Sequence, residues 1–375
     1  MAKKSCKTTL LGCLSILPDP RQDMNKLHLL LDILVIAVCA AVAGAEGWNE
    51  VEEFGRTREA WLKRFLSLPH GIPSHDTFRD VFLRLDPTAF SEAFMTWTRG
   101  VHRKTNGTIA IDGKTVRRSG GSHGSRHPLH LVSAWATEAG VCLGQVATSE
   151  KSNEITAIPT LLQMLELKGC LITIDAMGTQ CEIAKRITAQ CGDYILPAKE
   201  NQPNLHDQIR DFFTTAEKMN FQDVEFSTVK TVEKDHGRVE TRTYHLVRDL
   251  EWFDQKERWA NIAAIGRVVA ERRVNGNTSV ESRYFITSWK GDIHRFADAV
   301  RRHWGIENSL HWVLDVVFDE DHCRKRILNS PENFAIVRKF ALALLKRDTT
   351  SKGSIRGKRY RATLDTDYLE KVILG

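Results

Sequence analysis

The spacing of hydrophobic residues divides the chain into a helical beginning, a strand-rich middle and a helical end. Up to about residue 102, apolar residues recur every three or four positions, which predicts helices at 26–45, 49–67, 74–85 and 87–102. The first of these is apolar nearly all round, as expected of the central helix in a bundle. Ser74 and the Asp86-Pro87 pair are typical of helix starts. Residues 1–102 therefore predict an N-terminal helical domain.

From residue 108 the pattern changes to short apolar runs bounded by turn residues, which are typical of buried strands. Such runs occupy residues 108–112, 129–137, 141–148, 171–174 and 194–197. A helical pattern at 153–167 separates the third run from the fourth. The resulting order of strand, strand, strand, helix and strand predicts an α/β core.

Two of these strands lead directly into an aspartate. Asp112 follows the first run, and Gly113 is expected to let the chain turn there; Asp175 follows the fourth. After Asp175, the capping-box pattern of Thr179 and Glu182 is expected to open a helix. Ligands of open α/β sheets collect at the carboxyl ends of strands. Two carboxylates held together there repel unless protons or metal ions intervene, and their oxygens suit Mg²⁺ or Mn²⁺.

Cations follow the first aspartate closely. Lys114, Arg117 and Arg118 come within six positions of Asp112 and would meet a polyanion there. The ordinary alternative is a salt-bridged surface turn, which contributes little to stability.

A third acidic ligand is available in a long helical pattern at 292–318. Four polar residues recur there every fourth position and so share one helix face: His303, Glu307, His311 and Asp315. A polar stripe of this kind is more often a solvated face than a site. The flanking Trp304 and Trp312 favour a half-buried setting instead.

The chain resembles the insertion-sequence DDE transposases, specifically their H-repeat-associated branch, over about residues 16–346. The resemblance is carried by three stretches in this order: Ile111-Asp112-Gly113-Lys114, Ile174-Asp175-Ala176 and His303-Trp304-Gly305-Ile306-Glu307-Asn308. It implies that Asp112, Asp175 and Glu307 are the catalytic residues. As metal ligands, they would bind two Mg²⁺ or Mn²⁺ ions about 4 Å apart.

The fold implied by the resemblance is a ribonuclease-H-like catalytic core with an inserted, mostly β subdomain. The intervals agree, because 63 positions separate Asp112 from Asp175 but 132 separate Asp175 from Glu307. Four expected strands fill the longer interval, at 226–234, 238–247, 261–274 and 279–289. After the N-terminal domain we therefore expect a first core part, the β-rich insertion, a last core part with the glutamate helix and a basic C-terminal tail, at 103–220, 221–290, 291–347 and 348–375.

The implied function is DNA transposition. Strands would be cut at terminal inverted repeats, and the freed 3′-hydroxyl would then attack target DNA. The partners would be double-stranded DNA and a second subunit of a homodimer, and the N-terminal helical domain is a candidate for DNA binding. Residues expected to hold or orient DNA are Lys114, Arg117, Arg118, Lys199, Arg301, Arg302, Asn308 and His311.

Other functions stay open at this stage. Related transposases carry Tyr, Arg and Lys around the glutamate where this chain has Val300, His303 and Leu314. A decayed or domesticated relative that binds DNA without cutting, or a stand-alone Mg²⁺-dependent nuclease, would share the three carboxylates. A separate transition-metal cluster formed by His311, Asp315, Asp319 and His322 is a remoter alternative.

Composition adds few constraints. The 375 residues carry 53 Lys and Arg against 47 Asp and Glu, a net charge of +6 that is compatible with DNA binding but does not indicate it alone. The eight cysteines include no Cys-x-x-Cys pair, which argues against a zinc module or a disulfide framework and fits a cytoplasmic protein. The apolar run at 29–45 contains Asp32 and is interpreted as a buried helix rather than a membrane span.

Overall fold

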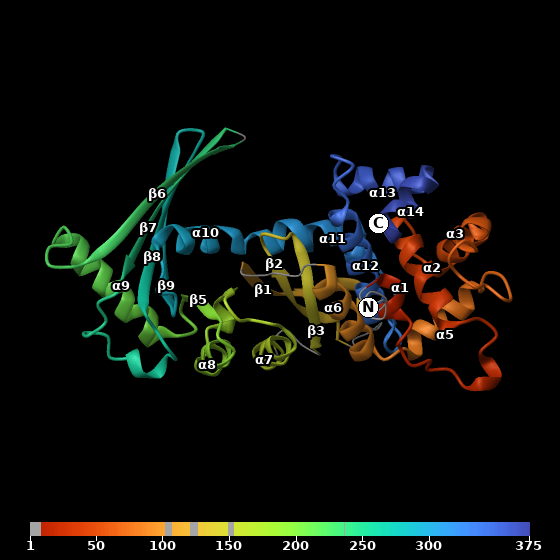
Figure 1. Ribbon diagram of the computed structural model, residues 1–375. Helices are drawn as coiled ribbons and strands as arrows, with labels where there is room; N and C mark the ends of the chain where they lie inside the picture. Colours follow the sequence, from red (N-terminus) through yellow and green to blue (C-terminus); the bar gives the residue numbers. More distant parts are fainter. Residues whose placement is uncertain (1–8, 102–106, 121–126, 149–153, 236) are drawn as a thin grey trace, which may run out of the picture.

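The computed structural model describes residues 9–101, 107–120, 127–148, 154–235 and 237–375. Within these ranges the protein is a mixed α/β structure in which helices of the N- and C-terminal segments lie together at one side of a large sheet (Figure 1). The predicted domain boundary after residue 102 lies outside the described residues.

Five strands form the half of the sheet that carries the predicted aspartates: β1 (Thr108–Thr115), β2 (His130–Ala136), β3 (Val141–Thr148), β4 (Leu171–Ile174) and β5 (Asp193–Ala198). β1, β2 and β3 pair antiparallel, whereas β4 is parallel to both β1 and β5. The predicted helix before β4 is α7 (Glu154–Met164), and α8 (Cys181–Ala189) follows β4. The predicted order of strands and helix is confirmed.

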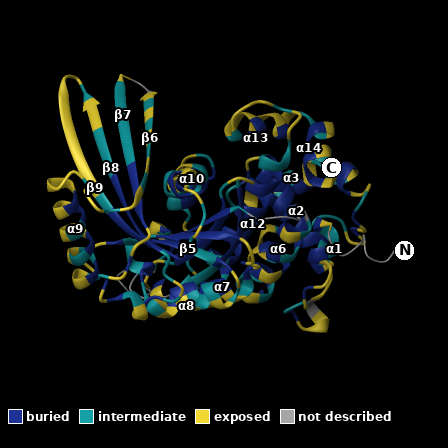
Figure 2. Ribbon diagram, turned by 60° about the vertical axis from the view of Figure 1, so that its left-hand side comes forward, coloured by how far each residue is buried: buried dark blue, intermediate teal, exposed yellow. Residues whose placement is uncertain are grey.

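The predicted β-rich segment continues this sheet. It comprises β6 (Phe226–Asp235), β7 (Arg238–Val247), β8 (Ala264–Val274) and β9 (Asn277–Thr287), preceded by α9 (Pro203–Lys218). β9 pairs antiparallel with β5, which gives nine strands in the order β3-β2-β1-β4-β5-β9-β8-β7-β6. The two hairpins project beyond the rest of the molecule, and the β8–β9 end is largely exposed (Figure 2).

Helices cover both faces of the central strands. α7 and α8 lie on one face, and α10 (Ile293–His303) crosses the other, with contacts from β6 and β7 to β1 (Figures 1 and 2). Because both faces are covered, β2, β4 and the first half of β1 are buried continuously rather than at alternate positions.

The strand register brings the two aspartates together. β4 ends at Ile174, which pairs with Ile111 of β1, so Asp112 and Asp175 are the next residues on neighbouring parallel strands. The predicted turn at Gly113 is wrong: β1 continues to Thr115 because its last residues keep their pairing with β2. The predicted capping box after Asp175 is also wrong, since the Thr179 hydroxyl donates to the Pro197 carbonyl instead.

The N-terminal helices are α1 (Leu10–Leu14), α2 (Leu30–Val42), α3 (Trp48–Thr57), α4 (Glu59–Leu62), α5 (His75–Arg84) and α6 (Pro87–Val101). The apolar helix predicted at the start is α2, whose residues are nearly all buried. The single helix predicted at 49–67 is instead two, divided at Arg58. None of the helices in the described ranges has both the length and the apolar character needed to span a bilayer.

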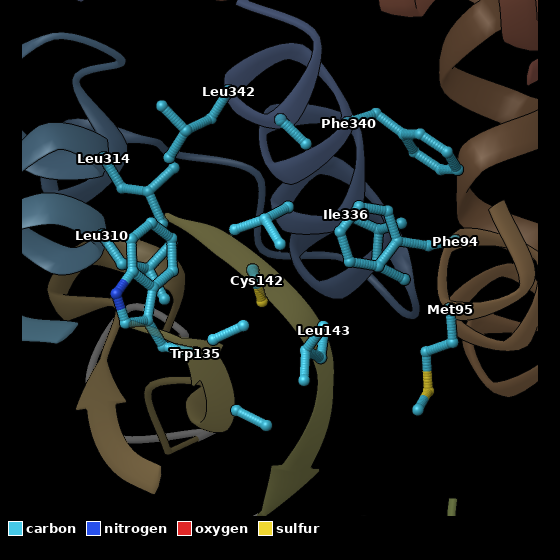
Figure 3. Close-up of a cluster of buried hydrophobic side chains, with 14 of the residues drawn as sticks. Phe94, Met95, Trp135, Cys142, Leu143, Leu310, Leu314, Ile336, Phe340 and Leu342 are labelled. Atoms are coloured by element: carbon cyan, nitrogen blue, oxygen red, sulfur yellow. The ribbon is translucent and has the colours of Figure 1, made fainter. Parts of the chain in front are cut away.

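One hydrophobic core joins the N-terminal helices to the sheet. α12 (Ser330–Arg347) packs against α2, α5, α6 and β3. Figure 3 shows the junction, where side chains of α6, β2, β3 and α12 interdigitate: Phe94, Met95, Trp135, Cys142, Leu143, Ile336 and Phe340. The half of the sheet formed by β1–β5 is therefore packed directly against the helical part.

The segment predicted as a basic C-terminal tail forms two packed helices, α13 (Ile355–Leu364) and α14 (Thr366–Leu374). Apolar residues of α14 are buried, including Leu369 and Val372. Two of its expected surface cations bond inside the protein: Lys358 donates to the Leu345 carbonyl, and Arg359 donates to the Ala41 carbonyl. Some of the basic residues of this segment therefore stabilise its packing against the rest of the protein.

Candidate active site

Glu307 lies in a distorted part of the helix that was predicted to be continuous over 292–318. α10 ends at His303, a π-helical turn spans Glu307–His311, and α11 covers Trp312–Val316. In the π-helical turn, the Trp312 amide donates to the Glu307 carbonyl, five residues earlier. Such widened turns occur frequently at functional sites.

The structure brings the three predicted carboxylates to one cleft. Asp112, Asp175 and Glu307 line a cavity of about 430 Å³ at the point where the pairing of β1 with β4 ends. The cavity is also lined by Thr173, Lys199, Arg283, His303 and Trp304. Residues from five separate regions of the sequence therefore share a single concave surface.

A tighter group within this cleft includes a histidine. Ligand atoms of Asp112, Glu307 and His311 all lie within 4.8 Å of one another. His311 Nδ1 is 3.1 Å from Glu307 Oε2 and 3.5 Å from Asp112 Oδ2. Asp175 is outside this group, and its carboxylate accepts a 3.3 Å hydrogen bond from the Gly178 amide.

The electrostatics of the aspartates favour a bound cation. Burial raises the pKa of Asp112 to about 6; His311 opposes this shift, and the charges of Asp175 and Glu307 add to it. Burial also raises the pKa of Asp175, reinforced by the nearby Glu154 carboxylate. In contrast, the hydrogen bond from His311 lowers the pKa of Glu307. Burial and neighbouring negative charges thus disfavour the ionised forms of Asp112 and Asp175. A divalent cation would compensate this negative charge, so the two carboxylates fit a metal site.

His303, the first residue of the predicted polar stripe, contacts the sheet. Its Nδ1 lies 3.0 Å from the Thr173 hydroxyl of β4. Burial lowers the pKa of His303 to about 4, with a smaller contribution from Lys199, so the imidazole is neutral near pH 7. Where related transposases have an arginine, this chain therefore has an uncharged side chain that joins the helix to β4.

Lys114 is placed differently from the expected DNA contact. Its Nζ lies 2.8 Å from Glu320 and also pairs with Asp315, and the lysine side chain is only 11% exposed. Burial opposes its charge, but these carboxylates outweigh that effect and raise the pKa of Lys114. The physical reason is the continuation of β1, which directs Lys114 toward α11 and the turn after it instead of solvent.

The other expected DNA-binding residues differ in availability. Arg117, Arg118, Lys199 and Asn308 are exposed, and Lys199 lines the cleft. Arg301 forms two 2.9 Å hydrogen bonds to Glu233 of β6, and Arg302 pairs with Asp298 at 2.6 Å. His311 lies under the carboxylates and is buried. The exposed cations around the cleft are thus fewer than the sequence indicates.

Two features of the site were missed by the sequence analysis. Arg283 of β9 lies over the Trp304 ring at 5.6 Å at the edge of the cleft. Beside Gly113, a buried Glu154 carboxylate lies 2.6 Å from His130 Nε2. The one sequence signal for this pair is Gly113, because a larger residue there would clash with Glu154 and His130. In the sequence analysis Gly113 was interpreted as a turn residue instead.

Replacing Gly113 with alanine is expected to destabilise the protein by about 1–3 kcal/mol. A Cβ there would lie 2.4 Å from Glu154 Oε1 and 2.6 Å from His130 Nε2, and the buried pair has little room to move. Denaturant unfolding would measure the difference. The control is Gly305→Ala in the helix, where the nearest atom is 3.8 Å from the added Cβ and a gain of about 0.5–1 kcal/mol is expected. Equal stabilities of the two variants would contradict this account of Gly113.

Comparison with known proteins identifies the family. The family described as "Transposase DDE domain" matches residues 103–344, and the one described as "DDE_Tnp_1-associated" matches residues 11–98. "Putative transposase YncI" of Escherichia coli O157:H7 is 42% identical over 97% of this chain and 94% of its own length. "H repeat-associated putative transposase YhhI" of Escherichia coli K12 is 40% identical over 98% of both chains.

Among solved structures, the piggyBac transposase synaptic complex with hairpin DNA aligns with all of this chain and 80% of that chain. Its TM-score is 0.41 and the sequence identity is 10%, values too low to support an argument. The sequence matches are sufficient by themselves, because the DDE-domain match covers most of the chain and both relatives align over nearly its whole length. The chain belongs to the DDE transposase family, in its H-repeat-associated branch.

Proposed function

We propose that this transposase cuts DNA at the ends of an insertion sequence and joins the freed 3′-hydroxyl to target DNA. The observation that carries the proposal is the convergence of Asp112, Asp175 and Glu307 in one cleft at the end of the parallel strands. We further propose that β1–β5 with their helices form a ribonuclease-H-like core and that β6–β9 are its insertion. The strand order β3-β2-β1-β4-β5 supports this division.

The three carboxylates would hold two divalent metal ions. Bound there, the ions would supply Lewis acidity and a nucleophilic hydroxide near neutral pH. The chain's own contribution is positional. The β1–β4 register fixes Asp112 beside Asp175, and the contact between His303 and Thr173 holds the helix that brings Glu307 over them.

The two proposed reactions are phosphoryl transfers of the same type. In the first, water attacks phosphorus and the 3′-oxygen leaves, taking up a proton to become a hydroxyl. In the second, this 3′-hydroxyl loses its proton, attacks a phosphorus of the target strand and displaces the target's own 3′-oxygen. No covalent bond to the protein forms, so no nucleophilic side chain is required.

DNA phosphates would be positioned by cations in and beside the cleft. Lys199 and Arg283 line the cavity, and Arg117 and Arg118 follow β1 on the surface. Such contacts orient DNA without reading its sequence. Since two element ends must be joined to one target, the active species is proposed to be a homodimer on double-stranded DNA.

A strand-transfer assay tests this function. The wild-type protein is incubated with a labelled duplex containing the element's terminal repeat, a supercoiled target plasmid and Mg²⁺ or Mn²⁺. We expect labelled ends covalently joined to the plasmid, and no product when EDTA is present. Cleavage without joined product would indicate a stand-alone nuclease, and binding with neither product would indicate a relative that no longer cuts.

A further inference from the structure

We propose that the His311 imidazole is itself a ligand of the metal centre, which makes the site a mixed carboxylate and histidine site that favours Mn²⁺ over Mg²⁺. The inference rests on the proposed function and adds to it a ligand outside the three carboxylates. It starts from the tight group of donor atoms formed by Asp112, Glu307 and His311.

The first support is the placement of the imidazole. His311 Nδ1 faces both carboxylates, at 3.1 Å from Glu307 and 3.5 Å from Asp112. The ring nitrogen therefore lies beside the two acids that would share a cation. A modest movement of these side chains would let all three donors contact one ion.

The second support is the backbone that carries two of the donors. Glu307 and His311 begin and end the π-helical turn. Residues four positions apart on a helix lie on one face, and paired ligands at this spacing bind a single metal ion in known helical sites. The widened turn thus brings a carboxylate and an imidazole from one short segment toward Asp112 of β1.

The third support is the burial of the imidazole. His311 is only 3% exposed, and its Nε2 is buried without a hydrogen-bond partner in the described residues. The polar contacts of the ring are thus the two carboxylates. Since Nδ1 is the nitrogen that faces both acids, it is the one that would bind the ion, and Nε2 is the one that would keep its proton.

The metal preference follows from ligand chemistry. Mg²⁺ prefers an octahedron of oxygen atoms, including waters that it releases reluctantly. An imidazole nitrogen suits transition metals better, while carboxylates suit Mn²⁺ and Mg²⁺ alike. One nitrogen among oxygen ligands should therefore raise the affinity for Mn²⁺ relative to that for Mg²⁺.

Pulsed electron paramagnetic resonance of the Mn²⁺-loaded full-length protein tests the ligand directly. We expect a nitrogen coupling from a directly bound imidazole, which changes when the protein is labelled with ¹⁵N-histidine and is lost in His311→Gln. The matched control is His294→Gln, which alters an exposed histidine of α10 that does not line the cleft and should keep the coupling. Bound Mn²⁺ without nitrogen coupling in the wild type would overturn the proposal. The ¹⁵N comparison decides the matter even if His311→Gln fails to fold.

Calorimetric titration tests the preference. The ratio of Mn²⁺ to Mg²⁺ affinity should fall at least about tenfold in His311→Gln and stay unchanged in His294→Gln. An unchanged ratio in His311→Gln would contradict the inference.

Failure of this inference is distinguishable from failure of the proposed function. If the wild type joins DNA but its bound Mn²⁺ shows no nitrogen coupling, only the histidine ligand is wrong. If it neither binds metal nor cuts DNA, the proposed function fails with it.

Discussion

The Asp175→Ala protein is expected to bind terminal-repeat DNA as the wild type does and to cut it at least about 10³-fold more slowly. Asp175 lies beside Asp112 in the strand register and lines the same cleft, so its loss would remove a metal ligand. Metal ions supply several kcal/mol of transition-state stabilisation, and each 1.36 kcal/mol changes a rate tenfold. Single-turnover cleavage of an end-labelled duplex gives the rate, and gel-shift titration gives the affinity.

The control for this experiment is Glu182→Ala. Glu182 is an exposed acidic residue in the first turn of α8, seven positions after Asp175, and it does not line the cleft. Its replacement should leave cleavage within a few-fold of wild type. Unchanged cleavage by Asp175→Ala would refute the proposed metal site. Loss of DNA binding together with cleavage would show that Asp175 supports the fold and not only the reaction.

Lys114→Met is expected to lower the free energy of unfolding by about 3–5 kcal/mol, because removing one partner of a buried ion pair leaves uncompensated charge. Lys114 bonds to Asp315 and to Glu320, whose side chain is only 1% exposed. The cluster joins β1, which carries Asp112, to α11 and the turn after it. Equilibrium unfolding in urea measures the change.

Two further variants define the origin of this effect. Adding Glu320→Gln to Lys114→Met should recover part of the lost stability, since the carboxylate that was left unpaired becomes neutral. Arg210→Ala removes a cation from the exposed pairs with Asp207 and Asp211 and should cost at most about 1 kcal/mol. A Lys114→Met loss no larger than that of Arg210→Ala would show that the buried cluster contributes little.

Local pattern was a good guide to the elements of this fold. The burial of α2 followed from its apolar residues, and the order of β1, β2, β3, α7 and β4 followed from run length and turn residues. The predictions that failed depended on neighbours. β1 continues past Gly113 because β2 pairs with it there, and Thr179 bonds to β5 rather than capping α8.

The candidate site was predicted unevenly for the same reason. Asp112, Asp175 and Glu307 could be named because each follows a recognisable strand or lies in a recognisable helix, and the family resemblance orders them. Lys114 and Arg301 were expected to contact DNA because their side chains are positively charged. In the structure they pair with carboxylates more than 60 positions away in the sequence. The carboxylate with which a cation pairs depends on how distant segments pack together, and a short sequence pattern carries no information about that packing.

The sequence by itself therefore determined most of the helices and strands and the family, and it led to the proposal of the three acidic positions, since periodicity and motif spacing are properties of short segments. Only the tertiary structure decided that β9 pairs with β5 and that Glu154 and His130 pack closely beside Gly113. It also decided that His311 faces Asp112 and Glu307. These contacts depend on strand register and on the π-helical turn, where a shift of one residue would redirect every side chain.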